Sequence, residues 1–429
     1  MRSNYKKIGP YIREVVEKNS DLAVKLLLGV SVSKEFIPSI ANIIGTDMST
    51  YKIVRKNQFA YGPVTSRNSD KVSIAMLNVD ECIVSTSYTV FEIIDHDTLL
   101  PEYLMMWFRR PEFDRYARFK SHGSVRELFD WEEMCDVELP MPSIEKQREI
   151  VKEYHTIVDR IKLNERLNQK LEETAQAIYK QWFVDFEFPI SAEYAAAIGE
   201  PELEGQPYKS SGGEMVFNEV LKQEIPKGWK LSTLGFEINY SKGFAFKSSD
   251  YKSCGIPIVR VSNFDGNTID IENCNCIDES QCGAYEKFRL NQFDIIISTV
   301  GSWPNNPDSV VGKVVMVPML ARGSLLNQNA VRLRAVRKIQ QFFIYYALAN
   351  EKFAGYVITG AQGSANQASV TLEHLFGFNL ILPDSSLEEF LYNVLSKLYN
   401  LKTSLENELF NLSKLERLIL SGMAQKGTS

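Results

Sequence analysis

The sequence contains no apolar stretch long enough to cross a membrane. A transmembrane helix needs about 20 consecutive, almost uncharged residues, and this chain of 429 residues, 24% of them charged, has no such run. Its first residues, Met1 to Pro10, also lack the apolar core of a signal peptide. We therefore expect a cytoplasmic protein, and the chain length predicts two or more domains.

Cysteine and histidine are scarce, at six and four residues. Six irregularly spaced cysteines in so long a chain do not make a disulfide framework, so reduced thiols are expected. Cys274 and Cys276, with Cys282, invite a zinc interpretation, but the spacing is not that of a zinc knuckle and no histidine lies near them. The histidines show no metal-ligand or triad spacing. The sequence therefore predicts no metal site.

Motifs for methyl transfer and ATP hydrolysis are missing as well. Methylation of a base amino group would need an Asn or Asp followed by two prolines and an aromatic residue, and the nearest approach, Asn-Asn-Pro-Asp at 305–308, has one proline and no aromatic. No Gly-x-x-x-x-Gly-Lys-Ser/Thr sequence occurs. Asp185 and Glu187 could be an acid and base pair, but they alternate with aromatic residues typical of packing at a helix end. We predict no catalytic residue and no cofactor on this chain.

Positive charge is not in excess, because the formal net charge is -6. The acidity is concentrated: residues 184–226 hold nine Asp or Glu and two Lys. The remainder is close to neutral, and residues 109–126 hold six basic residues against two acidic ones. A basic face is more often plain solvated surface, so charge favours nucleic-acid binding only slightly.

The sequence repeats itself at a spacing of about 240 residues, which fixes the architecture before any motif does. Residues 103–116 align with 343–356 without a gap, and the same register places His122-Gly-Ser on Gln362-Gly-Ser. The other matching pairs are 57–59 with 291–293, 83–91 with 325–333, and 139–142 with 380–383. Each half is thus one mixed domain followed by one helix.

The local patterns agree with this division and predict an α+β fold. Short β-branched runs at 83–94, 256–261, 294–299 and 311–317 predict strands, and 101–120 and 339–357 predict helices. Gly, Pro, Ser and Glu dominate 190–225, which predicts a linker. The expected parts are a first domain at 1–142, a central helix at 143–189, an acidic linker at 190–225, a second domain at 226–383 and a C-terminal helix at 384–425.

Both long helices carry the four-and-three spacing of a coiled-coil seam. The second seam runs through Leu387, Leu391, Val394, Leu398, Leu401, Leu405, Leu412, Leu415 and Ile419. The first runs through Ile150, Tyr154, Ile157, Ile161, Asn164, Asn168, Leu171, Ala175, Ile178 and Trp182. Because one helix follows each half, we expect them to pack antiparallel within the chain; pairing between two chains is the alternative, since heptads do not specify the partner.

The end of the central helix, Ala175-Gln-Ala-Ile-Tyr-Lys-Gln-Trp182-Phe-Val-Asp-Phe-Glu-Phe-Pro189, resembles the specificity subunits of type I restriction-modification systems. The resemblance covers the whole chain and includes the domain opening at 225–230 and the turn at 291–294. The second helix departs from the pattern, because it ends at Ile419-Leu-Ser-Gly-Met423 without a matching aromatic run.

The resemblance implies two target-recognition domains that each read one half of a bipartite, asymmetric site in double-stranded DNA, with the antiparallel helices setting the spacer. It also implies two methylation subunits that bind S-adenosylmethionine and two restriction subunits that use ATP and Mg²⁺. The residues expected to contact partner subunits are Gln181, Trp182, Phe183, Asp185 and Phe186.

Candidate DNA-contacting residues are polar or basic residues in loops at matching places of the two copies, because Asn and Gln pair with adenine and Arg pairs with guanine. In the first copy they are Thr65, Ser66, Arg67, Asn68, Ser85 and Ser87. In the second they are Lys242, Arg260, Ser298, Thr299, Ser302, Asn327, Gln328 and Asn329. The competing interpretation is that such residues only satisfy turns.

Two other functions fit the sequence. A stand-alone dimeric DNA-binding regulator would recognise a palindromic site, because identical subunits impose two-fold symmetry. A coiled-coil scaffold that binds no nucleic acid would not be retained by DNA in a mobility-shift assay at low salt.

Overall fold

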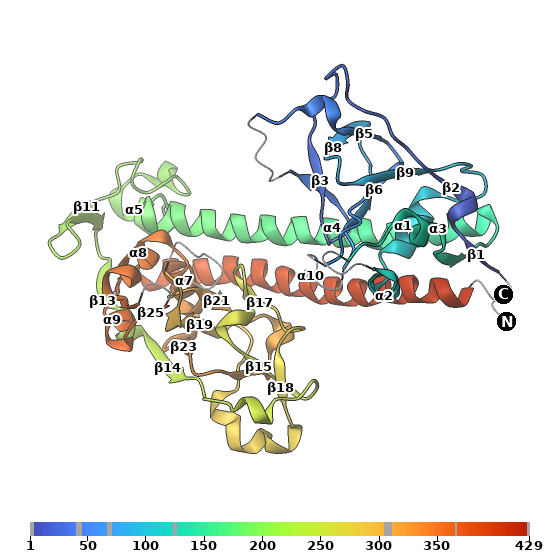
Figure 1. The fold of residues 1–429 in the computed structure, drawn as a ribbon. Helices are drawn as coiled ribbons and strands as arrows, with labels where there is room; N and C mark the ends of the chain where they lie inside the picture. The colour runs from blue at the N-terminus through green and yellow to red at the C-terminus, as the bar shows by residue number, and fades with distance from the viewer. Residues whose placement is uncertain are drawn as a thin grey trace. The chain divides into compact units, whose positions relative to one another are not determined.

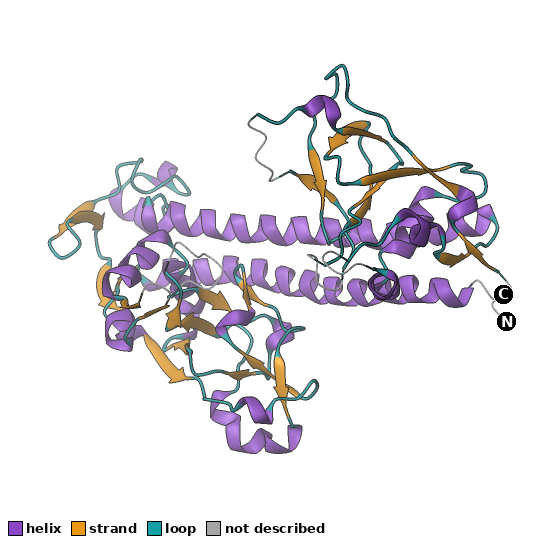
Figure 2. Ribbon diagram, viewed as in Figure 1, coloured by secondary structure: helices purple, strands orange, loops and turns teal. Residues whose placement is uncertain are grey.

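The computed structural model describes residues 4–39, 45–66, 71–122, 127–303, 311–364 and 367–426, and it divides into two compact units (Figures 1 and 2). Unit 1 comprises Met1–Leu163 and Phe410–Ser429, and unit 2 comprises Asn164–Leu409. Each unit therefore includes part of both long helices. None of the described helices is long and apolar enough to span a membrane.

Unit 1 is built on a four-stranded antiparallel sheet of order β2-β9-β6-β7. Its strands are β2 (Ile12–Glu14), β9 (Thr89–Ile93), β6 (Phe59–Tyr61) and β7 (Ile74–Met76). Three further pairs complete it: β1 (Tyr5–Lys7) with β10 (Glu138–Pro140), β3 (Leu28–Val30) with β4 (Phe36–Pro38), and β5 (Lys52–Arg55) with β8 (Glu81–Val84). The helices are α1 (Pro101–Phe108), α2 (Pro111–Lys120) and α3 (Trp131–Cys135).

Two predicted elements of unit 1 are each divided in two. The expected strand at 83–94 turns at residues 85–88, because the Ser85 and Ser87 hydroxyls hydrogen-bond each other at 2.7 Å and the Tyr88 amide donates to the Ser85 carbonyl. The expected helix at 101–120 breaks at Arg109 and Arg110, because Pro111 opens a new helix and excludes the α conformation from the residue before it.

Unit 2 repeats this plan with a sheet of order β14-β23-β19-β21. Its strands are β14 (Ile238–Lys242), β23 (Ala330–Ala335), β19 (Ile295–Ser298) and β21 (Val314–Met316). Additional sheets join β18 (Asn275–Ile277), β15 (Ile256–Val259) and β22 (Leu325–Leu326); β20 (Val300–Gly301), β25 (Gln367–Ser369) and β24 (Gln362–Ser364); β13 (Lys230–Thr233) and β26 (Asn379–Leu382); and β16 (Phe264–Asp265) and β17 (Thr268–Ile269). The helices are α6 (Leu234–Glu237), α7 (Gln341–Leu348), α8 (Glu351–Gly360) and α9 (Leu372–Phe376). The expected helix at 339–357 is thus also divided in two.

The strand registers confirm part of the predicted repeat and correct another part. Phe59 pairs with Phe91 in unit 1 as Ile295 pairs with Leu333 in unit 2, so 83–91 does correspond to 325–333. The match of 57–59 with 291–293 is wrong by two residues. Asn57 and Phe293 are equivalent, because both have φ of 69° and each donates its amide to the carbonyl of the residue that directly follows β7 or β21. The shared letters Asn-Gln-Phe hid this shift.

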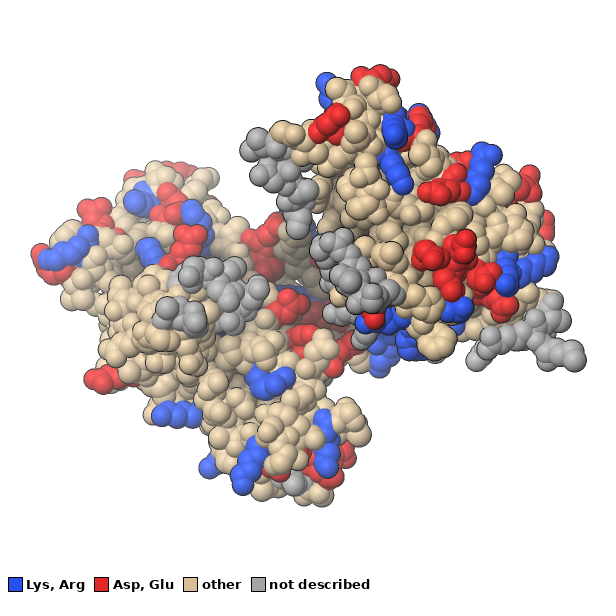
Figure 3. All heavy atoms as spheres, viewed as in Figure 1, with Lys and Arg blue, Asp and Glu red and all other residues tan. Residues whose placement is uncertain are grey.

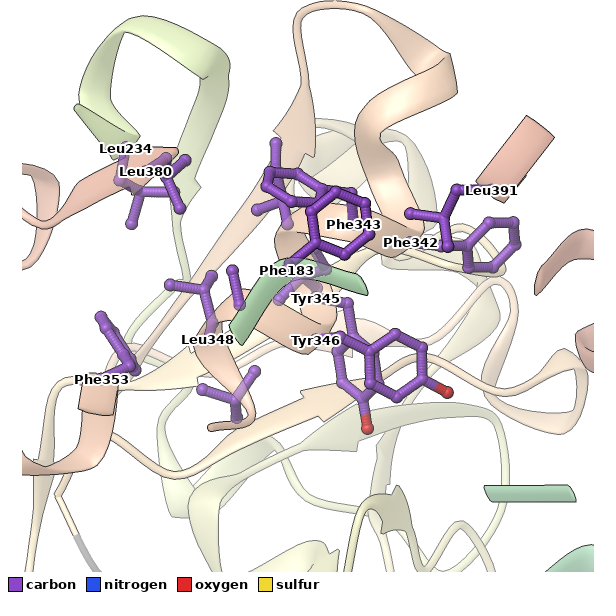
Figure 4. Packing of buried hydrophobic residues seen from close by; sticks show 14 of the residues in the cluster. Phe183, Leu234, Phe342, Phe343, Tyr345, Tyr346, Leu348, Phe353, Leu380 and Leu391 are labelled. Carbon is purple, nitrogen blue, oxygen red and sulfur yellow. The ribbon is translucent and has the colours of Figure 1, made fainter. Parts of the chain in front are cut away.

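An aromatic core holds unit 2 together (Figure 4). Phe342, Phe343, Tyr345 and Tyr346 of α7 are at most 3% exposed. Figure 4 shows Phe183, from the end of the central helix, beside Phe343, and the two ring centres are 5.0 Å apart. The core therefore ties the sheet domain to the long helices of its own unit.

The long helices are α4 (Ile144–Tyr179), which continues as a π-helical turn over Lys180–Val184, and α10 (Ser385–Lys426). In unit 2, Glu172 contacts Lys402 and Trp182 contacts Phe390, so the two helices run antiparallel there. In unit 1, the Tyr154 hydroxyl donates to Glu416 at 2.9 Å. The prediction of antiparallel pairing within one chain is confirmed.

The residues predicted to form the coiled-coil seam are better buried on α4 than on α10. On α4, every predicted seam residue is buried or half-buried. On α10, Leu401 is 51% exposed and Leu415 is 47% exposed. The α10 residues with little exposure include Leu391, Leu395 and Tyr399, which follow a spacing of four and pack into the core of unit 2. Contact with the sheet domain, rather than a strict heptad, orients this part of α10.

The segment 190–225, expected to be a linker, is folded. It contains α5 (Ala192–Ile198), β11 (Met215–Asn218) and β12 (Gln223–Pro226). Ile190, Ala195 and Tyr208 are at most 4% exposed and belong to the core of unit 2. Tyr208 stacks on Phe188, with ring centres 4.5 Å apart. A few apolar residues among the acidic ones are enough to anchor the segment.

Candidate nucleic-acid interface

The predicted DNA-contacting residues of unit 2 gather at one edge of its main sheet. Lys242, the last residue of β14, pairs with Val331 of β23. The Thr299 amide, just after β19, donates to the Asn329 carbonyl at 2.9 Å. The Asn327 amide donates to the Val259 carbonyl, which brings the loop after β15 to the same place. These contacts join residues 30, 68 and 89 positions apart in the sequence in one surface.

Only part of this set is available to a ligand. Lys242 and Gln328 are exposed, and Arg260, Thr299 and Asn329 are half-buried. Ser298, Ser302 and Asn327 are at most 9% exposed, which favours for them the alternative that such residues satisfy turns. Ser298 serves the fold, because its hydroxyl accepts a hydrogen bond from the Lys313 amide at 2.9 Å.

Arg260 is the predicted base-reading cation of this edge. Its guanidinium carbon lies 6.0 Å from the centre of the Tyr251 ring, and its Nε has no hydrogen-bond partner within the described structure. This Nε is buried, so a bidentate contact with guanine would have to come from the two terminal nitrogens of the guanidinium. The role of Arg260 stays a prediction.

Unit 1 presents the equivalent edge with different side chains. By the strand register, Ser85 and Ser87 stand where Asn327 and Asn329 stand in unit 2. The isolated β-bridge between Val64 and Leu128 corresponds to the pairing of Val300 with Ser369. Ser66 is therefore the counterpart of Ser302, because each lies two residues after the paired valine. Ser66 and Ser87 are exposed, and Ser85 is half-buried. Arg67 and Asn68 lie outside the described residues.

Thr65 does not face the ligand side. It is 1% exposed, and its hydroxyl donates to Ser121 Oγ at 2.9 Å and lies 3.2 Å from the Glu127 carbonyl. These bonds tie the loop after β6 to the segment after α2. Thr65 is therefore a packing residue, because every polar atom of its side chain is used inside the unit.

The basic run at 109–126 is largely neutralised by neighbouring carboxylates. Arg115 pairs with Glu112, Arg118 with Glu127, and Lys120 with Glu133. On the face shown in Figure 3, basic and acidic side chains are interspersed. Among the described residues of the run, these three cations are therefore paired rather than free.

The hairpin of β24 and β25 adds polar residues that the sequence prediction omitted. Gln362 and Gln367 are exposed at the hairpin, and β25 pairs with β20, which directly precedes Ser302. The Trp303 indole donates to the Ser364 carbonyl at 2.8 Å. The signal for this hairpin in the sequence is the Gly-Ser pair that the repeat shares, at 123–124 and 363–364.

The residues expected to contact partner subunits lie at the end of the central helix. Trp182, Phe183 and Phe186 are at most 8% exposed and pack against unit 2 itself. Phe183 and Phe186 both contact Trp229, at ring distances of 5.5 and 5.6 Å. Gln181 is exposed and Asp185 is half-buried. A partner could reach these two residues, whereas the aromatic rings stabilise the fold.

No group of three His, Cys, Asp or Glu side chains is placed to hold a metal ion in the part of the chain that the structure describes. Cys274, one of the thiols considered for zinc, is half-buried, and burial raises its pKa to about 12. A thiol with so high a pKa stays protonated at neutral pH and is a poor metal ligand.

The comparisons with known proteins agree with one another. The family model described as "Type I restriction modification DNA specificity domain" matches residues 6–173 and 226–414. The chain is 27% identical over 267 residues to the type I restriction enzyme MjaIX specificity subunit of Methanocaldococcus jannaschii, covering 62% of this chain and 55% of that protein. It is 28% identical over 159 residues to the HindI specificity subunit of Haemophilus influenzae, covering 37% of this chain and 34% of that protein. The matches thus span about half or less of these relatives.

The fold is also shared. The crystal structure of the S subunit of a type I restriction-modification system from M. genitalium aligns with a TM-score of 0.54 and 11% identity, covering 98% of this chain and 95% of that one. The two matched segments of the family model coincide with the two halves of the repeat and extend into both long helices. The chain therefore belongs to the family of type I restriction-modification DNA specificity subunits.

Proposed function

We propose that this chain reads a bipartite, asymmetric site in double-stranded DNA, with one half-site bound by each unit. One observation carries the proposal: the same sheet edge is built twice from one chain, but with unlike side chains. Among the residues that the structure describes, unit 1 offers Ser66, Ser85 and Ser87, whereas unit 2 offers Lys242, Arg260, Gln328 and Asn329. Because hydrogen-bonding groups determine which base edges are read, unlike sets select unlike half-sites.

The alternative of a stand-alone dimeric regulator predicts a palindromic target instead. The long helices, which a homodimer would need to share between chains, are paired within one chain here. The internal repeat gives the protein two related but unequal readers without a second copy.

In this proposal the chain supplies recognition and assembly but no catalytic group. Two methylation subunits with bound S-adenosylmethionine and two restriction subunits that use ATP and Mg²⁺ supply the chemistry, in the cytoplasm where the cellular DNA lies. Exposed Gln181 and half-buried Asp185, beside the π-helical turn of the central helix, are the proposed points of partner contact.

The test is to map methylated adenines in DNA treated with the chain together with its methylation subunit. We expect two unequal half-sites at one fixed separation, and no methylation by the chain with S-adenosylmethionine alone. A palindromic site, or methyl transfer by the isolated chain, would contradict the proposal. As an internal control, alteration of Gln328 should change only one of the half-sites.

A further inference from the structure

A buried ion pair of unit 1 holds the backbone of Val72. Lys34 Nζ lies 2.5 Å from Asp114 Oδ1, and the two side chains are 6% and 12% exposed. The Val72 amide donates to the same Asp114 oxygen at 2.9 Å, and the Val72 carbonyl accepts from Lys34 Nζ at 2.7 Å. Both backbone polar groups of Val72, which is itself 1% exposed, are thus bonded to the two members of one ion pair.

This pair is costly to bury. Burial lowers the pKa of Lys34 in spite of the opposing effect of Asp114, so the surroundings disfavour the charge of the lysine. Lys34 also lies in the turn between β3 and β4 with φ of 67°, a conformation that is uncommon for residues other than glycine. Two apolar side chains of similar volume often stabilise a protein as well as a buried ion pair does. The pair is therefore a poor device for stability alone.

The repeat shows that the fold does not need the pair. Asp114 corresponds to Ala354 in the gapless alignment of the two halves, and the strand registers make Val72 the counterpart of Gly312. In unit 2 the Gly312 amide donates to the Ser298 carbonyl at 2.9 Å. Unit 2 thus uses a backbone bond where unit 1 uses the Asp114 side chain.

The backbone held by the pair belongs to the segment that joins β6 to β7, at the proposed reading edge of unit 1. Residues 62–66 and 71–73 of this segment are described. Exposed Ser66, a candidate DNA-contacting residue, lies towards one end, and exposed Lys71 directly precedes Val72 at the other. A polar and a basic side chain therefore project from the two described ends.

Both described ends are anchored to the same helix. Asp114, in the first turn of α2, accepts from Val72, and Ser121, which directly follows α2, accepts from the Thr65 hydroxyl. Side chains that read bases have to be held within about 0.5 Å of the productive geometry. Anchoring the segment at two points on one helix provides that precision.

We propose that Lys34 and Asp114 are positioning residues for DNA recognition by unit 1. The pair holds Val72 and thereby sets where the exposed side chains of the segment, Ser66 and Lys71 among those described, meet the half-site. Neither Lys34 nor Asp114 contacts DNA, because both are buried. The inference rests on the proposed function and concerns the half-site of unit 1 only.

The first test replaces the pair by apolar side chains of similar size. Lys34→Met combined with Asp114→Leu removes both bonds to Val72 and leaves no unpaired charge, so the chain should fold and assemble. Methylation mapping of the assembled complex with a randomised target library should show discrimination weakened about tenfold in one half-site. The half-site altered by Gln328→Ala should keep its discrimination. Equal weakening of both half-sites, or of neither, would overturn the proposal.

A milder variant covers the case in which the apolar pair does not fold. In Lys34→Met with Asp114→Asn, the asparagine carbonyl can still accept from the Val72 amide, while the bond to the Val72 carbonyl is lost. Discrimination in the same half-site should weaken several-fold, and full discrimination would contradict the positioning role. Loss of folding in both variants would assign the pair to stability and also overturn the proposal.

A matched control applies the same two substitutions to another ion pair of unit 1. Lys7 and Asp136 lie 2.7 Å apart and are 56% and 50% exposed. Lys7→Met with Asp136→Asn should leave both half-sites unchanged. An effect equal to that of the Lys34 and Asp114 variant would show that the change is not specific to the residues that hold Val72.

The unaltered complex separates this inference from the proposed function. If it methylates a palindromic site, the proposed function fails, and the inference fails with it. If it methylates two unequal half-sites and the variants of Lys34 and Asp114 keep both of them, only the positioning role is wrong.

Discussion

Glu172 of α4 and Lys402 of α10 form an ion pair of 2.8 Å in unit 2, with only 13% and 16% of their side-chain surfaces exposed. The pair fixes which turn of one helix faces which turn of the other. Removing one partner leaves a poorly solvated charge, so Lys402→Met should lower the free energy of unfolding by about 3 kcal/mol. Chemical denaturation of the full chain measures this.

Two variants test whether the loss comes from the unpaired charge. Adding Glu172→Gln to Lys402→Met removes that charge and should recover much of the stability. Lys397→Met, at an exposed position of the same helix, should change the unfolding free energy by less than about 0.5 kcal/mol. A similar loss in both lysine variants would mean that the ion pair contributes nothing specific.

Lys242 should contribute affinity without sequence preference if it contacts phosphate. Lys242→Ala should then weaken binding of the assembled complex to all sites alike and reduce the slope of log affinity against log salt by about one. Lys352→Ala, on the exposed surface of α8, serves as the control and should leave the slope unchanged. A change confined to one target sequence would make Lys242 a base-reading residue instead.

Gln328 should read a base, because it is exposed in the loop that joins β22 and β23 and its amide can both donate and accept. Gln328→Ala should cost about 1–3 kcal/mol of discrimination at one base pair of one half-site. Methylation mapping with a randomised target library measures the preference at every position. An unchanged motif would remove Gln328 from the recognition surface.

The sequence was most informative where a pattern repeats over many residues. The 240-residue repeat and the apolar stripe of α4 predicted two related domains and an antiparallel helix pair, and both predictions are confirmed. The run from Ala175 to Pro189 identified the family, although its rings Trp182, Phe183, Phe186 and Phe188 are packed in the core.

What could not be predicted depends on contacts between distant residues. Thr65 is buried because its hydroxyl contacts Ser121 and Glu127, which are distant in the sequence. The basic run at 109–126 is neutralised in part by Glu127 and Glu133, which lie outside the run, so the charges within the run alone could not show the pairing. The equivalence of Asn57 with Phe293 is visible only in the backbone conformation and hydrogen bonds. In the sequence, the identical Asn-Gln-Phe at 57–59 and 291–293 gives a better match, but this match is two residues out of register.

Thr65 provides a direct test of the distinction between packing and reading. Thr65→Val removes a hydroxyl that bonds Ser121 and Glu127 and leaves the shape unchanged, so it should cost about 1–2 kcal/mol of stability. Base preference of the complex should stay the same. Ser66→Ala, at the exposed neighbouring position, should have the opposite profile: little effect on stability and an altered preference in the half-site read by unit 1.

Glu406 should make unit 2 less stable as the pH rises. Burial raises the pKa of this carboxyl; Lys402 lowers the pKa, and Glu172 raises it. The folded chain therefore holds the proton more tightly than the unfolded chain, whose glutamate has a pKa of about 4.3. Stability is lost as the pH rises from about 4.3 through the raised folded value. Glu406→Gln has no charge to bury, so its unfolding free energy should exceed that of the unaltered chain by an amount that grows across this window and then levels off.

Urea denaturation at a series of pH values measures the difference in unfolding free energy between the two chains, with Glu389→Gln on the exposed face of α10 as the control. A difference that shrinks with rising pH would show that the Glu406 carboxylate is stabilised by Lys402 rather than penalised by burial.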